Sequence, residues 1–340
     1  MNIQKFNLYE VGAHVRTPID ILICSSSYEA RSLSVPLCIS RNLVKKSFIF
    51  EAADLSTFIA DNTTRLRRHL GSTSEVISVD TTDPLLTADK MAELLPPINS
   101  QNVSSILIDV TTFTHEFLLI FLRLLRNSIH QKQIARILLA YTGASDYGIG
   151  ANVASKWLSK GVREVRTVLG YPGNNLPSRK THLIALVGYE NERASRMIEI
   201  LEPNSIALGF GRAGSETTEK NREANQHFHR LVSIMAASFA KVESFEIFCN
   251  NPVQTYRAIM AQARKADGRN VMLAPMNNKM STLGAALAGF ASEDIQICYA
   301  PVLEYNYFNY SKPGKHCYLI ELPELFNASP KLQNLQLAVA

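Results

Sequence analysis

The stretch SSSYEARS (residues 25–32) directly follows the apolar run ILIC, and VGYENERAS (residues 187–195) directly follows a second apolar run, LIAL. Each stretch places a small residue, a tyrosine, a glutamate and then an arginine just after a candidate strand. A local pattern that occurs twice at this distance indicates that the chain contains one α/β unit in two copies.

Four further segments recur in the same order. VDTTDPLLTADK and FCNNPVQTYRAI each end an apolar run and continue with a polar turn, a proline and a threonine three residues later. Of the other three pairs, one shares a strand-turn-helix pattern, the next shares a tyrosine followed by an acidic-tyrosine pair, and the last shares a Ser-Lys start. The five pairs begin at residues 25 and 187, 79 and 248, 106 and 271, 137 and 295, and 159 and 311. Their spacing changes gradually, as expected for a duplicated domain.

Apolar β-branched runs alternate in both copies with segments of helical period, which is typical of a parallel sheet covered on both faces. The sequence therefore predicts an α/β fold. It would consist of two tandem Rossmann-like domains with mainly parallel sheets, related by internal duplication and an approximate two-fold axis. The breaker-rich stretch GYPGNNLPSRK predicts the boundary. We expect a first domain over residues 1–172, a linker over 173–180 and a second domain over 181–340.

Composition limits the classes of function. The 340 residues are 46% hydrophobic, which is enough for two cores. The net charge of +5 suits an anionic ligand and makes a surface that coats long nucleic acid less expected. The five cysteines are odd in number and lack CxxC spacing, and three of them, Cys24, Cys249 and Cys298, lie in apolar runs. These three are expected to be buried free thiols.

No segment indicates a membrane partner. The longest apolar stretch, FLLIFL, ends at Arg123 and falls short of the ~20 residues that a membrane span requires. The N-terminal sequence MNIQKFNLYE has no apolar segment of the signal-peptide type. We therefore expect a cytoplasmic location.

The candidate ligand-binding residues lie where predicted strands end, because ligands of open parallel sheets bind at the carboxyl ends of the strands. Small residues there allow a tight turn and leave backbone N–H groups open to an anion. The alternative is structural: serine caps a helix, glutamate suits its dipole and arginine pairs with glutamate. After the first strand of each copy, the candidates are Ser26, Ser27, Tyr28, Glu29 and Arg31, and Gly188, Tyr189, Glu190 and Arg193.

The turns DVTTFTHE and APMNNKMST supply further candidates, Asp109, Thr111, Thr112, Thr114, Asn277, Asn278 and Lys279. A lysine at a helix N-terminus opposes the helix dipole unless it faces a bound anion, so Lys279 is either a ligand contact or a solvated side chain. Arg212, in the glycine-rich GFGRAGSE, adds a cation to the second copy only. We predict that Lys279 contributes more to ligand binding than its first-copy counterpart, Thr114.

Standard catalytic motifs are absent from the sequence, which contains no GxSxG or HExxH pattern. Neither SSSYEARS nor VGYENERAS satisfies the GxGxxG or GxxxxGK[ST] pattern of a nucleotide-binding loop. His227 and His229 are two residues apart on a predicted helix and so diverge. We predict neither a cofactor nor a metal, and the sequence identifies no catalytic residue.

Two Rossmann-like units with Thr- and Lys-bearing turns resemble the CRISPR-associated Rossmann-fold (CARF) sensor domains, and more closely the fused, two-lobed SAVED type of bacterial antiviral signalling. In that family a turn of the kind Asp-x-Thr-x-Gly-x-Lys helps hold cyclic oligonucleotides. DVTTFTH keeps Asp109 and Thr111 but has Phe113 and His115 in place of the Gly and Lys, whereas APMNNKM keeps Lys279 and lacks the Asp. The resemblance, which is architectural over most of the chain, implies a nucleotide-sensing defence subunit.

Three functions remain open. The first is a sensor that binds a nucleotide or cyclic oligonucleotide between its two lobes and signals to a protein partner subunit. The second is an enzyme acting on nucleotides or nucleic acid, of phosphodiesterase or glycosidase type, that uses Glu29 or Glu190. The third is a scaffold subunit of a protein complex. Similar polar turns in both copies favour the sensor, since a scaffold needs only its cores and an enzyme usually keeps one active copy.

Overall fold

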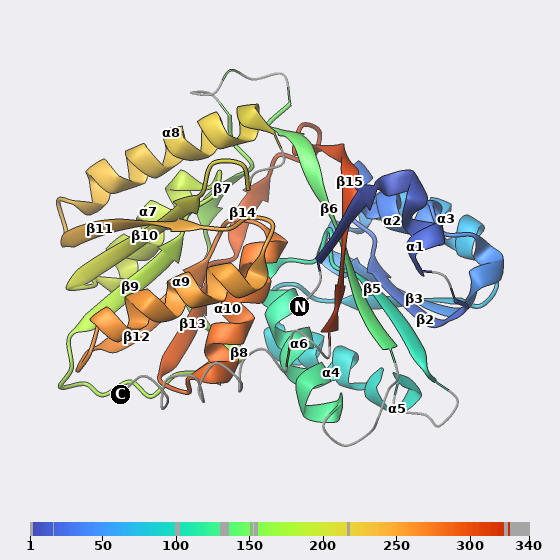
Figure 1. The fold of residues 1–340 in the computed structure, drawn as a ribbon, viewed down its shortest axis with the longest axis horizontal. Helices are drawn as coiled ribbons and strands as arrows, with labels where there is room; N and C mark the ends of the chain where they lie inside the picture. The colour runs from blue at the N-terminus through green and yellow to red at the C-terminus, as the bar shows by residue number, and fades with distance from the viewer. Residues whose placement is uncertain are drawn as a thin grey trace. The chain divides into compact units, whose positions relative to one another are not determined.

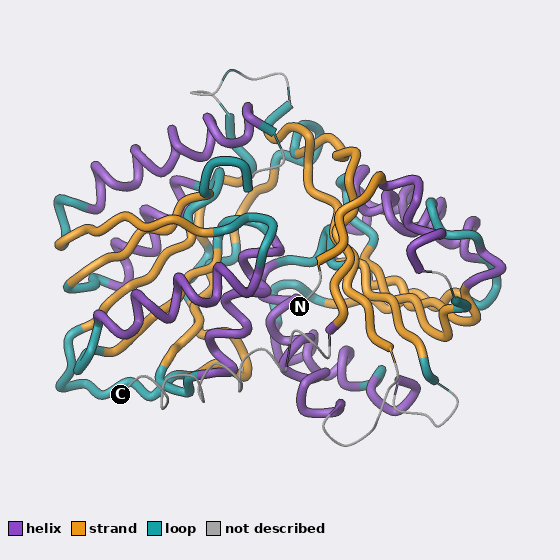
Figure 2. Tube along the Cα trace, in the orientation of Figure 1, coloured by secondary structure: helices purple, strands orange, loops and turns teal. Residues whose placement is uncertain are grey.

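The computed structural model describes residues 3–15, 17–98, 103–129, 136–149, 152, 156–215, 218–322 and 326. The chain divides into two compact units. The first unit combines Met1–Ser145 with Ser311–Phe326, and the second contains Asp146–Tyr310. Strands alternate with helices along most of the chain (Figure 2).

The first unit is built on a seven-stranded sheet in the order β1-β15-β6-β5-β2-β3-β4. Strand β2 runs parallel to β3 and β5, β3 runs parallel to β4, and β5 runs parallel to β6, whereas β1 is antiparallel to β15. The strands are β1 (Ile3–Asn7), β2 (Ile19–Ser25), β3 (Val44–Ala52), β4 (Ser74–Val79), β5 (Ser105–Asp109), β6 (Arg136–Tyr147) and β15 (Ser311–Glu321).

The second unit is built on a six-stranded sheet in the order β11-β10-β9-β12-β13-β8. Its first five strands are parallel, and β8 is antiparallel to β13. A two-stranded sheet pairs β14 with β7. The strands are β7 (Ser159–Val162), β8 (Arg166–Pro172), β9 (Thr181–Leu186), β10 (Ser205–Gly211), β11 (Lys241–Ile247), β12 (Asn270–Pro275), β13 (Ile295–Tyr299) and β14 (Val302–Tyr305).

Helices cover both faces of each sheet. In the second unit, α7 and α8 lie on one face and α9 and α10 on the other (Figure 1). The α helices of the first unit are α1 (Val11–Val15), α2 (Ser34–Leu37), α3 (Ser56–Leu70), α4 (Pro84–Ala92), α5 (Leu95–Ile98) and α6 (His115–Ile129), and its 3-10 helices are η1 (Leu8–Glu10), η2 (Ala30–Leu33), η3 (Arg41–Leu43) and η4 (Ala53–Leu55). Those of the second unit are α7 (Asn191–Leu201), α8 (Glu219–Ala236), α9 (Pro252–Lys265) and α10 (Lys279–Ala291).

Matched signals start the same helix in the two units. Asp83 and Asn251 are N-caps that accept hydrogen bonds from backbone N–H groups, and each is followed by a proline at the first helical position. Thr87 Oγ1 donates to the Asp80 carbonyl at 2.7 Å, and Thr255 Oγ1 donates to a carbonyl seven residues before it at 2.9 Å. The prolines and threonines that recur in the sequence therefore do the same structural work in both units.

Five strands of each unit follow one order. The order β4-β3-β2-β5-β6 of the first unit matches β11-β10-β9-β12-β13 of the second, and both correspond to the 3-2-1-4-5 order of a Rossmann sheet. The predicted α/β fold, with two Rossmann-like and mainly parallel sheets, is confirmed. The matching strand orders also agree with the predicted duplication.

The last strands of the two copies are exchanged. Strand β8 follows β6 in the sequence but pairs with β13, and β15 follows β14 but lies beside β6. The predicted linker over residues 173–180 lies inside the second unit, where Asn175 Nδ2 donates to Gln296 Oε1 at 2.6 Å. The units therefore have other limits than the expected domains, 1–172 and 181–340. A repeat in the sequence assigns β8 to the first copy and β15 to the second, whereas each of these strands pairs in the sheet of the other unit.

Candidate functional site

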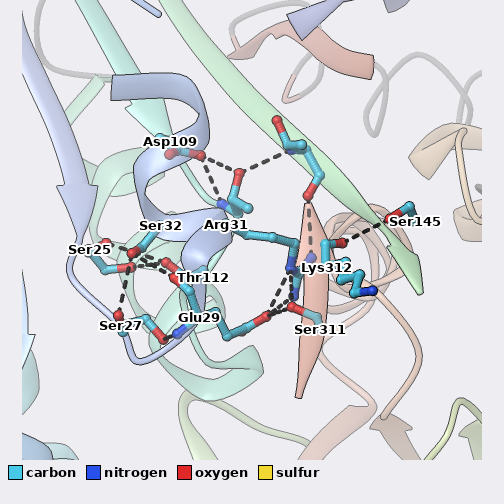
Figure 3. A network of polar contacts seen from close by, with 12 residues as sticks. Ser25, Ser27, Glu29, Arg31, Ser32, Asp109, Thr112, Ser145, Ser311 and Lys312 are labelled. Carbon is cyan, nitrogen blue, oxygen red and sulfur yellow. Dashed lines mark hydrogen bonds and ion pairs between the residues drawn. The ribbon is translucent and has the colours of Figure 1, made fainter. Parts of the chain in front are cut away.

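A buried ion pair lies just after the first parallel strand of the first unit. Glu29 Oε2 accepts hydrogen bonds from Arg31 Nη2 at 2.6 Å and Nε at 2.9 Å, and from Ser311 Oγ at 2.5 Å (Figure 3). Arg31 also donates from Nη1 to the Thr142 carbonyl at 3.3 Å and from Nε to Ser311 Oγ at 3.0 Å. We call Glu29, Arg31 and Ser311 the first latch, since Ser311 begins the exchanged strand β15.

The second unit repeats this arrangement. Glu190 accepts from Arg193 Nη1 at 2.7 Å and from Ser159 Oγ at 2.5 Å. Ser159 begins β7, which precedes the exchanged strand β8. We call Glu190, Arg193 and Ser159 the second latch. Both glutamates and both arginines are buried. Because each serine donates a hydrogen bond to its glutamate, each latch connects an exchanged segment to the turn after a central strand.

The two latches differ in how completely the arginine is bonded. Arg193 Nε and Nη2 are buried and have no hydrogen-bond partner among the described residues. The Arg193 Cζ lies 4.6 Å from the centroid of the Tyr299 ring. Burial opposes its charge, but Glu190, Tyr299 and Tyr305 hold the pKa of Arg193 above its usual value. Arg193 therefore keeps its charge with part of its donor capacity unused.

Asp109 ends β5 at the same edge of the first sheet. Its Oδ1 accepts from Thr111 N at 3.0 Å and Thr111 Oγ1 at 2.5 Å, and Thr111 Oγ1 accepts from Thr142 N at 3.0 Å. Burial raises the pKa of Asp109 to about 7, although the Thr111 hydrogen bonds and the Arg31 charge lower it. Thr112 Oγ1 lies 2.8 Å from Ser25 Oγ. These side chains tie the β5 turn to its neighbours.

The remaining candidates of the first unit are bonded locally. Thr63 Oγ1 donates to Ser26 Oγ at 2.8 Å, and Asn62 Nδ2 donates to the Ser27 carbonyl at 2.7 Å, so both serines fasten the turn to α3. Tyr28 is half-buried in this turn. Its neighbour Glu29 occupies the N-cap position of η2 without a side-chain cap.

The loops after four adjacent strands of the second unit are hydrogen-bonded to one another. Asn277 Nδ2 donates to the Val187 carbonyl at 2.7 Å, and Cys249 Sγ donates to Asn277 Oδ1 at 3.3 Å. Cys249 N donates to Ser215 Oγ at 3.2 Å, and Ser215 Oγ donates to the Arg212 carbonyl at 2.7 Å. We call Val187, Arg212, Ser215, Cys249 and Asn277 the loop cluster, which lies at the carboxyl edge of the sheet.

Two cations lie at this edge. The Arg212 side chain is 54% exposed and lies 3.7 Å from Glu246, which is itself half exposed. Lys279 is the first residue of α10, half-buried, and follows the N-cap Asn278, whose Oδ1 accepts from Ser281 N at 2.9 Å. Because a helix N-terminus favours negative charge, both cations and the start of α10 suit an anion.

Gly188 and Tyr189 have structural roles. A Cβ atom at Gly188 would lie 2.5 Å from the Met276 carbonyl oxygen, so glycine lets the loop after β9 pack against the loop after β12. Tyr189 OH donates to Asn221 Oδ1 at 2.8 Å, and its ring centroid is 4.9 Å from that of Tyr147. As in the first unit, the glutamate precedes its helix, and Glu190 occupies the N-cap position of α7.

The predicted correspondence between Thr114 and Lys279 is shifted by one residue. Phe117 N donates to Thr114 Oγ1 at 3.1 Å, so Thr114 caps α6 as Asn278 caps α10. His115, the first residue of α6, is the counterpart of Lys279. The latch serines Ser159 and Ser311 were not among the predicted site residues, although each begins a Ser-Lys repeat that the sequence displays.

The described residues contain no group of three or more His, Cys, Asp or Glu side chains placed to hold a metal ion. Over the same residues, every helix is too short or too polar to cross a bilayer.

Comparison with known proteins gives distant structural similarity. No protein-family model matches the sequence, and no curated protein matches it. A spermidine synthase complexed with the transition-state analogue AdoDATO aligns at 13% identity and a TM-score of 0.24, over 41% of this chain and 42% of that one. The cytoplasmic domain of a prokaryotic cation chloride cotransporter aligns at 10% identity and a TM-score of 0.22, over 85% of this chain and 98% of that domain.

Proposed function

We propose that the protein is a nucleotide- or oligonucleotide-sensing subunit of a bacterial antiviral defence system, and that its ligand binds at the carboxyl edge of the second unit's sheet. The loop cluster carries this proposal. Its hydrogen bonds join the loops that follow β9, β10, β11 and β12, and these loops bear Arg212 and lead into Lys279. The resemblance to the CARF and SAVED sensors supports the biological setting.

The chemistry of the edge favours phosphate. A guanidinium donates two parallel hydrogen bonds to a phosphate, and charge-assisted hydrogen bonds of this kind are stronger than neutral ones. The Arg212 guanidinium is exposed, and its ion pair with Glu246 is long and therefore weak. A phosphate that binds Arg212 would displace only this weak interaction. The N–H groups at the start of α10 add donors beside Lys279.

The same edge of the first unit is less suited to an anion. Asp109 is bonded to Thr111, and Thr112 lies against Ser25. Among the described residues of the turns after β2 and β5, the only arginine or lysine is Arg31, which is buried in the first latch. The preference for the second unit follows from this difference. Glu29 and Glu190 are each bonded to an arginine and a serine, which suits a fastening role better than general-base catalysis.

The test begins with the purified full chain, denatured to release bound material, whose absorbance near 260 nm and mass are then measured. Isothermal titration with nucleoside triphosphates, cyclic dinucleotides and cyclic trinucleotides follows. We expect at least one of these to bind, and Lys279→Ala and Arg212→Gln to weaken that binding by about tenfold or more each.

Arg264→Gln, which removes an exposed charge from the last turn of α9, is the matched control and should leave affinity unchanged. The proposal fails if no nucleotide is released or bound, or if the two site variants bind as tightly as the wild type.

A further inference from the structure

A pocket of about 460 Å³ lies at the opposite, amino edge of the first unit's sheet, where α3 ends and β4 begins. Arg67 and Arg68 come from the last turn of α3, and no acidic residue lines the pocket. Its lining residues are Thr64, Arg67, Arg68, Gly71, Ser72 and Ser74.

A third guanidinium, that of Arg41, lies beside Gly71, one of the residues that line this pocket. Gly71 has a φ of 83°, and a Cβ atom there would lie 2.2 Å from Arg41 Cζ, so the guanidinium lies directly against the glycine. Arg41, Arg67 and Arg68 are all exposed. In the part of the chain that the structure describes, these three arginines make neither a hydrogen bond nor an ion pair through their side chains. Their charge is therefore not neutralised by the fold.

A second pocket of about 420 Å³ shares Ser72 and Ser74 with the first and extends the basic surface. Lys45 and Lys46 line it, and both side chains are exposed. Lys45 Nζ lies 2.6 Å from Asp20, and Lys46 Nζ lies 3.2 Å from Glu75. We call Arg41, Lys45, Lys46, Arg67 and Arg68 the basic groove. Its arginine end is unneutralised and its lysine end is paired.

The duplication shows that the fold does not require these arginines. Cations in the last turn of a helix interact favourably with the helix dipole, which would explain Arg67 and Arg68 without a ligand. However, α8 occupies the same place in the second unit, and its last turn has no basic residue. Ile234 is 69% exposed near that end. The helix therefore forms in either case, and the arginines are particular to the first unit.

We propose that the basic groove binds a ligand with several phosphate groups along a chain. The guanidinium groups of Arg67 and Arg68 and the Ser72 hydroxyl line the arginine end, and the Arg41 guanidinium lies against Gly71 beside them. Such a set of donors suits one phosphate. The adjoining pocket places two lysines where further phosphates of the same chain would lie. A single-stranded oligonucleotide and a linear inorganic polyphosphate both have this chemistry. The groove lies at the amino edge of the first unit's sheet, whereas the proposed sensing site lies at the carboxyl edge of the second unit's sheet.

The experiment measures binding of a short fluorescent oligothymidylate by anisotropy at about 50 and 200 mM salt, and of inorganic tripolyphosphate by calorimetry. The Arg67→Gln/Arg68→Gln variant should weaken binding of the phosphate chain by about tenfold or more at low salt. If the oligonucleotide is the ligand, the slope of log K against log salt should become shallower by about 1.4, which is about 0.7 for each lost contact. Binding of tripolyphosphate alone identifies polyphosphate as the source and also supports the proposal.

The matched control is Arg257→Gln/Arg264→Gln, which removes two exposed charges from α9 of the second unit. This control should bind within about twofold of the wild type, and all variants should keep the wild-type melting temperature. The proposal is overturned if neither probe binds at low salt, or if the control weakens binding as much as the groove variant. Both readouts are independent of the nucleotide titrations of Lys279 and Arg212.

Discussion

The two units share a framework and differ in what the framework leaves open. Both have the same five-strand order, the same Pro-Thr helix start and a Glu-Arg-Ser latch. In the first unit Arg31 donates to three different groups, whereas in the second unit two nitrogens of Arg193 have no partner among the described residues. The difference teaches that duplicated backbone geometry is kept more faithfully than duplicated side-chain chemistry.

The latches also link the exchange of strands to the turns at the carboxyl edge. Each serine arrives with the exchanged segment, and each donates to the glutamate that follows the central strand. A buried carboxylate requires a counter-charge and hydrogen bonds. The hydrogen bond from the serine to the glutamate therefore stabilises the exchanged segment in its place, in addition to the pairing of strands.

The largest effect is expected from breaking the latches. Arg31→Leu leaves Glu29 buried without its counter-charge and should lower the free energy of unfolding by about 3–5 kcal/mol. Arg193→Leu should cost at least about 1 kcal/mol less, because Arg193 makes fewer hydrogen bonds than Arg31. Urea denaturation of the two variants measures the difference. Equal losses would show that the latches are equivalent, and a larger loss for Arg193→Leu would contradict the predicted ranking.

The two units should respond to pH with opposite sign. The pKa of Asp109 rises from 3.8 in the unfolded chain to about 7 in the fold, so stability falls as pH rises from about 4 to 7, where only the unfolded chain loses the proton. Burial, together with the Arg269 charge, lowers the pKa of His182 from 6.5 to about 4, so its contribution is lost as pH falls through that window.

Each effect should amount to a few kcal/mol and can be separated by mutation. Asp109→Asn should remove the fall in stability toward pH 7, and His182→Asn should remove the fall toward pH 4. Denaturation midpoints between pH 4 and 7.5 measure both changes. Identical pH profiles for the two variants would contradict the opposite signs.

A smaller effect should separate the turns after β2 and β9. Gly188→Ala places a methyl group against the Met276 carbonyl and should destabilise the protein by about 1–3 kcal/mol through overpacking. Ser27, at the matching place in the first unit, already has a side chain, and Ser27→Ala should cost about 1 kcal/mol or less. Thermal denaturation of both variants decides, and a harmless Gly188→Ala would mean that the loop after β12 can move away.

The smallest effects should be nearly equal in the two units. Thr87→Val and Thr255→Val each remove a hydroxyl that bonds backbone seven residues earlier, and each should cost about 1 kcal/mol. Thr255 should be slightly the more sensitive, because its Oγ1 also accepts from Phe248 N at 3.0 Å. Costs that differ by more than about 1 kcal/mol would show that this shared motif has diverged.

Much of the fold follows from local sequence. The alternation of apolar runs and helical segments predicted both sheets, and the repeated Pro and Thr signals lie at equivalent helix starts, because these signals act within a few residues. The exchange of β8 and β15 was not predicted, since strand pairing between distant segments leaves no local pattern. The domain limits depend on that pairing.

The position of the candidate site residues in the fold was predicted in part, whereas their role in binding stays a prediction. The residues at the strand ends do lie at the carboxyl edges of the sheets, as the general rule for parallel sheets requires. Their bonding was not predictable, because the serines that donate to the buried Glu29 and Glu190 come from segments more than 30 residues away in the sequence. The matching of Thr114 to Lys279 missed by one residue, since the turns before α6 and α10 bear different side chains.

Hydrogen exchange with a bound nucleotide tests most directly whether the second unit holds the sensing site. With the full chain saturated by the nucleotide that binds in titration, peptides covering Gly188, Arg212, Cys249 and Lys279 should gain protection at the loop cluster. Peptides covering Glu29 and Asp109 in the first unit should exchange as they do without ligand. Protection confined to the first-unit turns, with unchanged exchange at the loop cluster, would contradict the assignment.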